Sequence, residues 1–595
     1  MIYSIRSQRL RNILKILARG IRAAAIAAIT INVALPGTAS AAVDNQYIVL
    51  CYHSMPERYN GDPMAISVPN FAEQLSWLRE QGYKAISMDD VINAKTGKIK
   101  LPAKSFMITV DDGYEDFYTN IFPILKLYKV PAVLAVVGRW TETGTPLENE
   151  TDIYFKKQRF ASWSHIKEMV DSGLVEIASH SYDLHHGILG NPQGNTEPAA
   201  VTLLYDKATG QYETLEQRRA RVRADLEKNS ASIERKLGKR PRIMVWPYGE
   251  YDSIGIEEAA RLGMRINFTL NEGLASASNT EIVPRALLDK EMPLTTFSAL
   301  VEQLRQSSSS PTVRALKINL DNLYDANLEK QSQKLGKLID GIRDLGINTV
   351  LLQPFVSPRH DGLIEEVYFP NSVLPMRGDL ANRVAWQLLR RLNVSVYALI
   401  PASNYAVREN GRLRRLDVSD ETDRAQLLKL YEDFGSHTPL RGLVFMDALT
   451  APSQSDFNQE ILDRISYYRP PYRPFYAGRM FIDPGISGEG KKNYNALDQR
   501  HQLVVIDAPI NQRPDWIRDF IAKLPTKQGA LLSLPVDNLT EEKLRLLIQK
   551  ISFFRRHGLN NFLLDDDRFL DDPAAVSVVR LAVSLKDNPY VHVGQ

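Results

Sequence analysis

Short apolar runs alternate with amphipathic stretches along the first half of the chain. In the stretch 69–82, for example, Phe71, Leu75 and Leu78 share one helical face, and Gly82 follows. Such alternation is typical of βα units, whose strands pair in parallel beneath their helices. The sequence therefore predicts a parallel sheet or barrel, with polar site residues at the carboxyl ends of the strands. Strands are expected at residues 47–52, 106–110, 132–137, 175–178, 243–246 and 266–270, and helices near 117–128, 163–171, 213–237 and 254–262.

The second half of the chain shows the same alternation. A strand-like run at 315–320 is followed by a helical stretch near 328–344 and by another run at 349–352. Repeated units of this kind predict a (β/α)8 barrel. Further strands are expected at residues 394–399, 443–446, 503–506, 530–532 and 561–564. The expected fold class is therefore α/β, with two successive barrels.

One clear linker separates the two halves. Residues 304–313 read L-R-Q-S-S-S-S-P-T-V, a serine-rich composition that is typical of a flexible connection. A chain of 595 residues is too long for a single hydrophobic core. We expect a first domain at 42–304, a linker at 305–313 and a second domain at 314–595.

The first 41 residues are typical of a secretory signal peptide. Basic residues, with no acidic one among them, precede an apolar run at 23–35, and the small residues Ala39-Ser40-Ala41 follow. The apolar run is shorter than the roughly 20 residues that a membrane span requires. We expect cleavage after Ala41; the alternative is an uncleaved anchor.

Charge and cysteine content narrow the range of partners. The formal net charge is +3, but without residues 1–41 the 73 basic residues fall to 67 against 70 acidic ones, a balance of −3. A weakly acidic mature chain lacks the basic surface of a nucleic-acid-binding protein, so we expect no nucleic acid partner. Cys51 is the single cysteine and can form no internal disulfide. Its place in an apolar run predicts a buried strand residue without a lipid anchor.

Carboxylates and imidazoles follow two of the expected strands. Asp111 and Asp112 come directly after one strand, and His180 and His185 follow another. Taken singly, an Asp-Asp-Gly sequence is often only a turn, and two nearby histidines are often surface residues. However, only 10 histidines occur in the chain, and three lie within 180–186, with His186 as a competing ligand. Together the four groups provide one base and three ligands for a divalent ion that activates water.

Two further segments follow strands and are expected near the same site. Trp246 ends the run at 243–246, and Pro247 and Tyr248 follow it. These three residues are expected to form a substrate-facing wall, although ordinary core packing is the alternative. His53 lies at the end of the first strand and is expected to line the catalytic site.

Three of these segments carry a family resemblance. T-V-D-D-G-Y at 109–114, H-S-Y-D-L-H at 180–185 and W-P-Y-G at 246–249 resemble the motifs of the polysaccharide deacetylases. The resemblance implies a deacetylase-type (β/α) barrel for the first domain. It also implies that the metal is zinc, nickel, cobalt or iron, a choice that the sequence leaves open.

The resemblance also assigns a role to each polar residue. It implies that Asp111 is the general base and that Asp112, His180 and His185 bind the metal. Asp111 would take a proton as water attacks the acetyl carbon, while the ion and a backbone N–H near Tyr248 would stabilise the oxyanion. The implied products are acetate and a free glucosamine amine.

The resemblance continues beyond the linker. K-I-N-L-D-N-L-Y-D at 317–325, N-T-V-L-L-Q-P-F at 348–355 and N-R-V-A-W-Q-L at 382–388 resemble a two-domain subgroup, the poly-β-1,6-N-acetyl-D-glucosamine N-deacetylases. This implies a glycoside-hydrolase-like second barrel and partial deacetylation of an exported biofilm polysaccharide. It also implies a periplasmic location, association with the outer membrane and an export porin as a partner. The alternatives are a chitooligosaccharide or peptidoglycan deacetylase and a non-catalytic glycan-binding scaffold.

The sequence departs from the family pattern in two places. The segment 281–293 lacks the late histidine that usually serves as general acid, so the sequence leaves the general acid open and predicts slow, incomplete deacetylation. In the second barrel, Met446 precedes Asp447 where the subgroup has an Asp-Asp pair, so glycan binding is expected rather than cleavage. Asp321 and Asp447 are the expected substrate-binding residues, although carboxylates after strands also cap helices. Other carboxylates that follow strands in this half are Asp325, Asp507 and Asp565.

Overall fold

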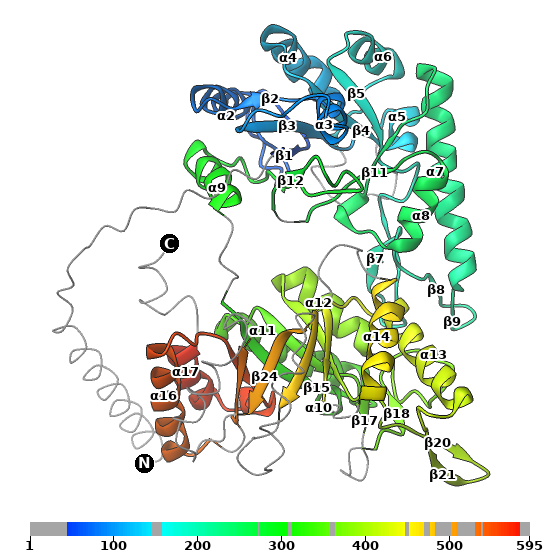
Figure 1. Ribbon diagram of the computed structural model, residues 1–595, viewed down its shortest axis with the longest axis vertical. Helices are drawn as coiled ribbons and strands as arrows, with labels where there is room; N and C mark the ends of the chain where they lie inside the picture. Colours follow the sequence, from blue (N-terminus) through cyan, green and yellow to red (C-terminus); the bar gives the residue numbers. More distant parts are fainter. Residues whose placement is uncertain are drawn as a thin grey trace, which may run out of the picture.

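The structure is a computed structural model of the 595-residue chain. Two units, joined through the segment that follows helix α9, lie one above the other (Figure 1). The expected signal peptide, 1–41, lies outside the described residues. The structure describes residues 45–145, 157–271, 273–306, 312–356, 363–446, 452–468, 476–481, 501–507, 530–536 and 539–583.

The first unit is built on a mostly parallel sheet. Its strand order is β12-β1-β3-β4-β5-β10-β11-β13, and β12 (Ala275–Ser276) pairs antiparallel with β1. The parallel strands match the apolar runs expected from the sequence, because each is buried on both faces. They are β1 (Gln46–Tyr52), β3 (Ser105–Val110), β4 (Ala132–Val136), β5 (Val175–Ser179), β10 (Ile243–Val245) and β11 (Ile266–Phe268).

A short segment curls this sheet towards a barrel. Strand β13 (Ile282–Val283) pairs with β11 at one edge, whereas β14 (Ala286–Leu287) pairs with β1 near the other edge. The chain therefore crosses the seam of the sheet between these strands, at Pro284 and Arg285. This crossing places Arg285 beside the carboxyl end of β3.

Helices cover the outside of the first sheet, as the amphipathic stretches predicted. Phe71, Leu75 and Leu78 of α2 are buried against it. Helix α7 closes with Gly238 in the left-handed region, a typical helix C-terminus. The covering helices include α2 (Val68–Glu80), α3 (Met88–Lys95), α4 (Phe122–Tyr128), α6 (Trp163–Asp171), α7 (Leu215–Leu237) and α8 (Ser253–Arg261).

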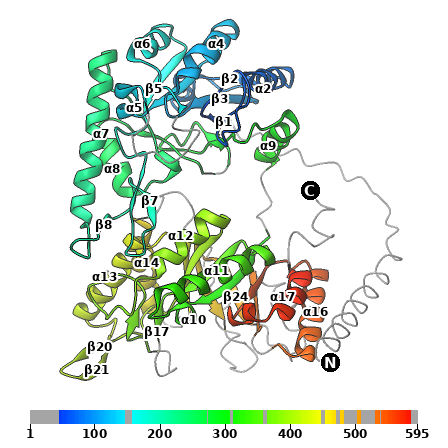
Figure 2. The same ribbon diagram turned by 180° about the vertical axis from the view of Figure 1, so that it is seen from behind.

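An insertion between β5 and α7 was not predicted. It contains two hairpins made of very short strands, which give little periodicity in the sequence. Figures 1 and 2 both show its strands beside α12 (Ala381–Leu392) and α14 (Pro452–Ser466), at the junction of the two units. The hairpins are β6 (Gly187–Leu189) with β7 (Thr196–Pro198) and β8 (Tyr205–Asp206) with β9 (Gln211–Tyr212).

The second unit is a closed barrel of parallel strands, so the expected (β/α)8 fold is confirmed. The sequence pattern predicts every barrel strand except β23, where Gly478 and Arg479 interrupt the apolar run. The strands are β15 (Arg314–Asn319), β16 (Thr349–Gln353), β19 (Ser395–Ile400), β22 (Gly442–Phe445), β23 (Tyr476–Phe481), β24 (His501–Asp507), β25 (Ala530–Leu534) and β26 (Phe562–Leu564).

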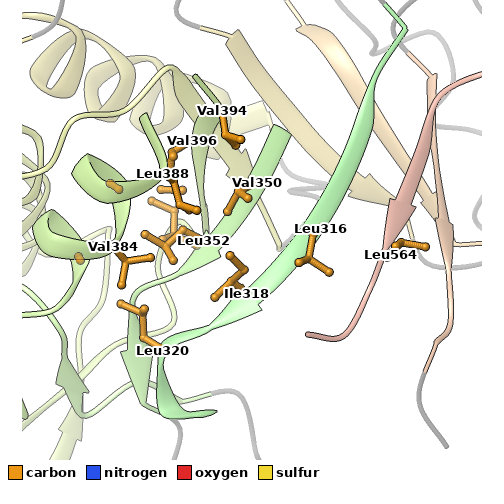
Figure 3. Packing of buried hydrophobic residues seen from close by; sticks show 14 of the residues in the cluster. Leu316, Ile318, Leu320, Val350, Leu352, Val384, Leu388, Val394, Val396 and Leu564 are labelled. Atoms are coloured by element: carbon orange, nitrogen blue, oxygen red, sulfur yellow. The ribbon is translucent and has the colours of Figure 1, made fainter. Parts of the chain in front are cut away.

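Alternation along the strands divides the second core into two layers. Leu316 and Ile318 of β15 point outward, towards the same cluster as Val384 and Leu388 of helix α12 (Ala381–Leu392) (Figure 3). Ala315 belongs instead to a separate cluster made of alternate residues from neighbouring strands. The strands are thus buried both inside the barrel and beneath the helices, which explains their continuous apolar runs.

The connection between the units is short. Helix α9 (Leu294–Gln306) continues into the expected linker, and β15 begins at Arg314.

In the part of the chain that the structure describes, no helix is long and apolar enough to cross a membrane.

Candidate active site

The two aspartates lie on a tight turn at the end of β3. The Asp111 N–H donates to the Tyr52 carbonyl, which keeps the turn against β1. Asp112 and Gly113 both have left-handed backbone angles, with φ of 72° and 79°. A side chain at Gly113 would also contact Val136 at 3.2 Å. Glycine is therefore favoured here by its left-handed conformation, and the close approach of Val136 adds to that preference.

Two histidines from the segment that follows β5 face Asp112. The Nδ1 of His180 lies 2.8 Å from the Val245 carbonyl, which directs its Nε2 towards Asp112. The Nε2 atoms of His180 and His185 lie 3.4 and 3.3 Å from Asp112 Oδ1. This oxygen is buried and accepts no hydrogen bond within the described residues.

This arrangement fits a divalent metal ion. One ligand atom from each of Asp112, His180 and His185 lies within 4.8 Å of the others. Two imidazoles and a carboxylate form a donor set typical of zinc and similar ions, and they leave positions open for water and substrate. The orphaned Asp112 oxygen, which is costly when buried alone, would gain the partner that it lacks.

The charges around the triad also suit a metal. Burial lowers the pKa of His185 to about 4, so its ring is neutral and able to ligate near pH 7. Burial acts in the same direction on His180, but the adjacent Asp112 and Asp111 outweigh it and raise its pKa. A cation is therefore favoured beside these two buried carboxylates.

Arg285 holds Asp111 from the seam of the sheet. Its guanidinium donates to both carboxylate oxygens, at 2.7 and 2.9 Å, and also to Thr109 Oγ1 and the Thr269 carbonyl. Burial acts to raise the pKa of Asp111, but this ion pair outweighs it and holds the pKa at about 2. Asp111 is thus an ionised and oriented carboxylate.

Sequence reasoning missed Arg285, although a signal was present. An arginine inside the apolar segment I-V-P-R-A-L-L at 282–288 would be buried, and a buried arginine requires an acidic partner. The sequence alone does not identify that partner, because the bond links residues 174 positions apart.

Cys51 and His53 complete the surroundings of Asp111. Cys51 is buried in β1, as expected, and its thiol donates to Asp111 Oδ2 at 3.5 Å. Burial raises the pKa of this thiol, which therefore stays protonated. Potential ligand atoms of Cys51, His53 and Asp111 lie within 4.8 Å of one another, but the Arg285 charge disfavours a second cation here. The Nδ1 of His53 is buried and has no hydrogen-bond partner in the described parts of the chain.

The expected aromatic wall is reduced to one residue. Trp246 is only 1% exposed, and its indole N–H donates to Asn267, so the prediction that it faces substrate is wrong. Pro247 is buried as well. Tyr248 is 40% exposed, has a left-handed φ of 59° and places its ring 4.5 Å from that of His185. Trp246 belongs to the core because its ring packs beneath α8.

The second barrel contributes fewer described candidates. Asp321 follows β15, accepts a 2.5 Å hydrogen bond from the Tyr368 hydroxyl and lies 3.7 Å from Arg377. Asp325 accepts from the Asn327 N–H and contacts Lys334, which is a local structural role. Asp447 and the side chain of Asp507 lie outside the described residues.

Comparison with known proteins agrees with this geometry. Residues 98–267 match a polysaccharide deacetylase family model, and residues 317–469 match a model described as hypothetical glycosyl hydrolase family 13. A poly-β-1,6-N-acetyl-D-glucosamine N-deacetylase of Escherichia coli K12 is 35% identical over 425 residues, which are 68% of this chain and 62% of that protein. The match thus spans less than two thirds of that relative.

Two further relatives match shorter regions. An enzyme with the same name from Staphylococcus aureus N315 is 25% identical over 228 residues, which are 38% of this chain and 69% of that protein. The solved structure of a de-N-acetylase from Aggregatibacter actinomycetemcomitans is 36% identical, with a TM-score of 0.40, and covers 43% of this chain and 100% of its own. Residues 98–267 thus match the polysaccharide deacetylase family, and over 425 residues the chain is similar to a poly-β-1,6-N-acetyl-D-glucosamine N-deacetylase.

Proposed function

We propose that the chain is a metal-dependent N-deacetylase that removes acetyl groups from exported poly-β-1,6-N-acetyl-D-glucosamine. One observation carries the proposal: Asp112, His180 and His185 converge beside an ionised Asp111 that Arg285 holds at both oxygens. A non-catalytic glycan-binding scaffold would need neither an oriented base nor a metal triad.

The metal ligands and the base have different roles in the proposed reaction. Asp112, His180 and His185 would hold the ion, which supplies Lewis acidity to polarise the acetamide carbonyl and acidify a water. Asp111 accepts the proton of the attacking water, because it is ionised and Arg285 holds its carboxylate in one orientation. Zinc, nickel, cobalt and iron all suit the donor set.

The departing amine needs a proton when the C–N bond breaks. His53 is the proposed donor, since it lies beside Asp111 and its Nδ1 has no hydrogen-bond partner among the described residues. Water and amide thus yield acetate and a free amine: one water proton passes to Asp111, His53 gives a proton to the amine nitrogen, and the second water proton leaves to solvent as the acetic acid product ionises. Tyr248, exposed next to His185, offers an aromatic face to the sugar ring.

The second barrel is proposed to bind the partly deacetylated product rather than cleave it. Asp321 is partly exposed at the carboxyl end of β15, where barrel sites lie. Its carboxylate would attract the ammonium groups that deacetylation creates. The Met446-Asp447 sequence, without a paired aspartate, also favours binding over hydrolysis.

Acetate release from defined oligomers tests the proposed reaction. Oligomers of β-1,6-linked N-acetylglucosamine should release acetate, and a chelator should abolish the release until metal is restored. β-1,4-linked chitooligosaccharides and peptidoglycan fragments should release much less. Equal release from all three would contradict the proposed substrate, and chelator-resistant release would contradict metal dependence.

Location is a separate part of the proposal. The basic and apolar opening and the Ala39-Ser40-Ala41 sequence support export to the periplasm, where an outer-membrane porin would receive the polymer. Mass spectrometry of the periplasmic fraction should find a chain that begins near Ala42 and an unmodified Cys51. An intact Met1 in that fraction, or a lipid on Cys51, would contradict this.

A further inference from the structure

One segment singled out in the sequence has no part in the chemistry above. N-R-V-A-W-Q-L at 382–388 lies in helix α12 of the second barrel. Val384 and Leu388 pack into the core of that barrel. Asn382 and Trp386, one helical turn apart, instead contact the insertion of the first unit, near β7 (Figures 1 and 2).

Asn382 lies at the centre of this contact. Its Oδ1 accepts from Asn191 at 2.7 Å, and its amide donates to Glu197 Oε2 at 3.1 Å and to the His437 carbonyl at 2.7 Å. Both amide hydrogens and the carbonyl oxygen are therefore used. Asn382 and Asn191 are both buried, so no exposed alternative partner replaces these bonds easily.

Two further hydrogen bonds join the region around the start of α12 to the same hairpin. The Trp386 indole N–H donates to the Thr196 carbonyl at 3.1 Å. Gln193, in the hairpin turn, donates to the Asp379 carbonyl at 2.8 Å. The turn and the returning strand of the β6–β7 hairpin are thus held by the second barrel.

The other end of this hairpin carries a proposed metal ligand. His185 lies two residues before β6, and the carbonyl of the next residue, His186, accepts from the Ala199 N–H at 3.1 Å. Within the hairpin, Ile188 pairs with Glu197 and Leu189 pairs with Thr196. Strand β7, which α12 contacts, is therefore directly paired with β6, the strand that follows His185.

We infer that Asn382 and Trp386 of the second barrel are positioning residues for the metal site of the first, acting through the β6–β7 hairpin on His185. This inference rests on the proposed function. A loop that is already ordered loses less conformational freedom when its histidine binds metal, so the contact should increase metal affinity. The second barrel would then complete the metal centre as well as bind polymer.

Cobalt titration of the metal-free full-length chain tests this inference. Asn382→Ala and Trp386→Phe should each raise the Kd for Co²⁺ on the order of 10-fold, the lower end of the range for residues that orient metal ligands. Trp386→Phe keeps the apolar ring but cannot donate to Thr196. In the metal-free state, hydrogen exchange of the peptide 184–199 should be faster in both variants than in the wild type.

Tyr467→Phe is the matched control. The Tyr467 hydroxyl accepts from Arg219 at 2.6 Å and donates to Glu257 at 2.8 Å, which joins the same two units away from the hairpin. This variant should leave the Co²⁺ Kd within twofold of the wild-type value. An equal loss of affinity in Tyr467→Phe would overturn the inference, because general docking rather than the hairpin would then hold the site.

Two further outcomes separate this inference from the proposed function. Unchanged Co²⁺ affinity and exchange in both α12 variants would overturn the inference alone. A wild-type chain that binds no Co²⁺ would overturn the metal-dependent function itself. If Asn382→Ala fails to fold, as judged by circular dichroism, Trp386→Phe decides the question.

Discussion

Asp111 is oriented by two parallel hydrogen bonds from one guanidinium, and this pairing can be tested directly. Arg285→Lys keeps a positive charge but cannot donate to both oxygens in a fixed fork. We expect kcat to fall on the order of 10- to 100-fold, as for other residues that orient a catalytic group. KM and metal content should change little, because Arg285 contacts neither the proposed ligands nor the exposed Tyr248. Unchanged kcat in steady-state acetate release would contradict this role.

A second experiment distinguishes the proposed base from the proposed metal ligands by their effects on activity and on metal content. Asp111→Asn should abolish acetate release while metal content, measured by atomic emission, stays near that of the wild type. His180→Ala should lose both, because two remaining protein ligands hold the ion poorly. His186→Ala provides a neighbouring histidine outside the triad and should retain metal. Substantial activity in Asp111→Asn would show that another group is the base.

Two helices offer a matched test of packing. Gly255 in α8 packs directly on Trp246, where an added Cβ would approach the indole ring at 2.6 Å. Gly336 in α11 (Leu328–Leu345) has nothing within 4 Å of that position. Gly255→Ala should therefore destabilise the chain by about 1–3 kcal/mol through overpacking. Gly336→Ala should stabilise it by up to about 1 kcal/mol, since alanine favours a helix. Urea unfolding measures both, and a stabilising Gly255→Ala would contradict the buried position of Trp246.

The contact between the two units contains a buried acid that makes stability depend on pH. Asp379 accepts from the Tyr212 hydroxyl, and burial raises its pKa to about 6. An acid with a raised folded-state pKa binds more protons in the folded than in the unfolded state, so stability falls as pH rises between roughly 4 and 6.

Asp379→Asn should remove this contribution. The amide oxygen can still accept from Tyr212, and the Gln193 bond goes to the unchanged main chain. The variant should be more stable than the wild type at pH 7.5, by at most about 3 kcal/mol for a shift of this size. The difference should disappear near pH 4. A difference of equal size at both pH values in urea unfolding would contradict the assignment.

Local pattern determined most of the strands and helices, since an apolar run or a helical stripe reports directly which faces are buried. It also located Asp111, Asp112, His180 and His185, because each follows a strand and strand ends converge in a parallel sheet. The elements that the sequence pattern did not predict also have local explanations. The hairpins at 187–212 are too short to show periodicity, and β23 is interrupted by Gly478 and Arg479.

Only the tertiary structure decided which distant residues meet. Arg285 reaches Asp111 because β13 and β14 cross the seam of the sheet, and closure of a sheet is not encoded in any single stretch. Trp246 belongs to the core rather than to the substrate because α8 covers it. Asn382 acquires its role from a hairpin of the other unit. The sequence by itself thus determined the elements and the ligands of the proposed metal site, whereas long-range packing determined how Asp111 is held and which residues contact the hairpin that follows His185.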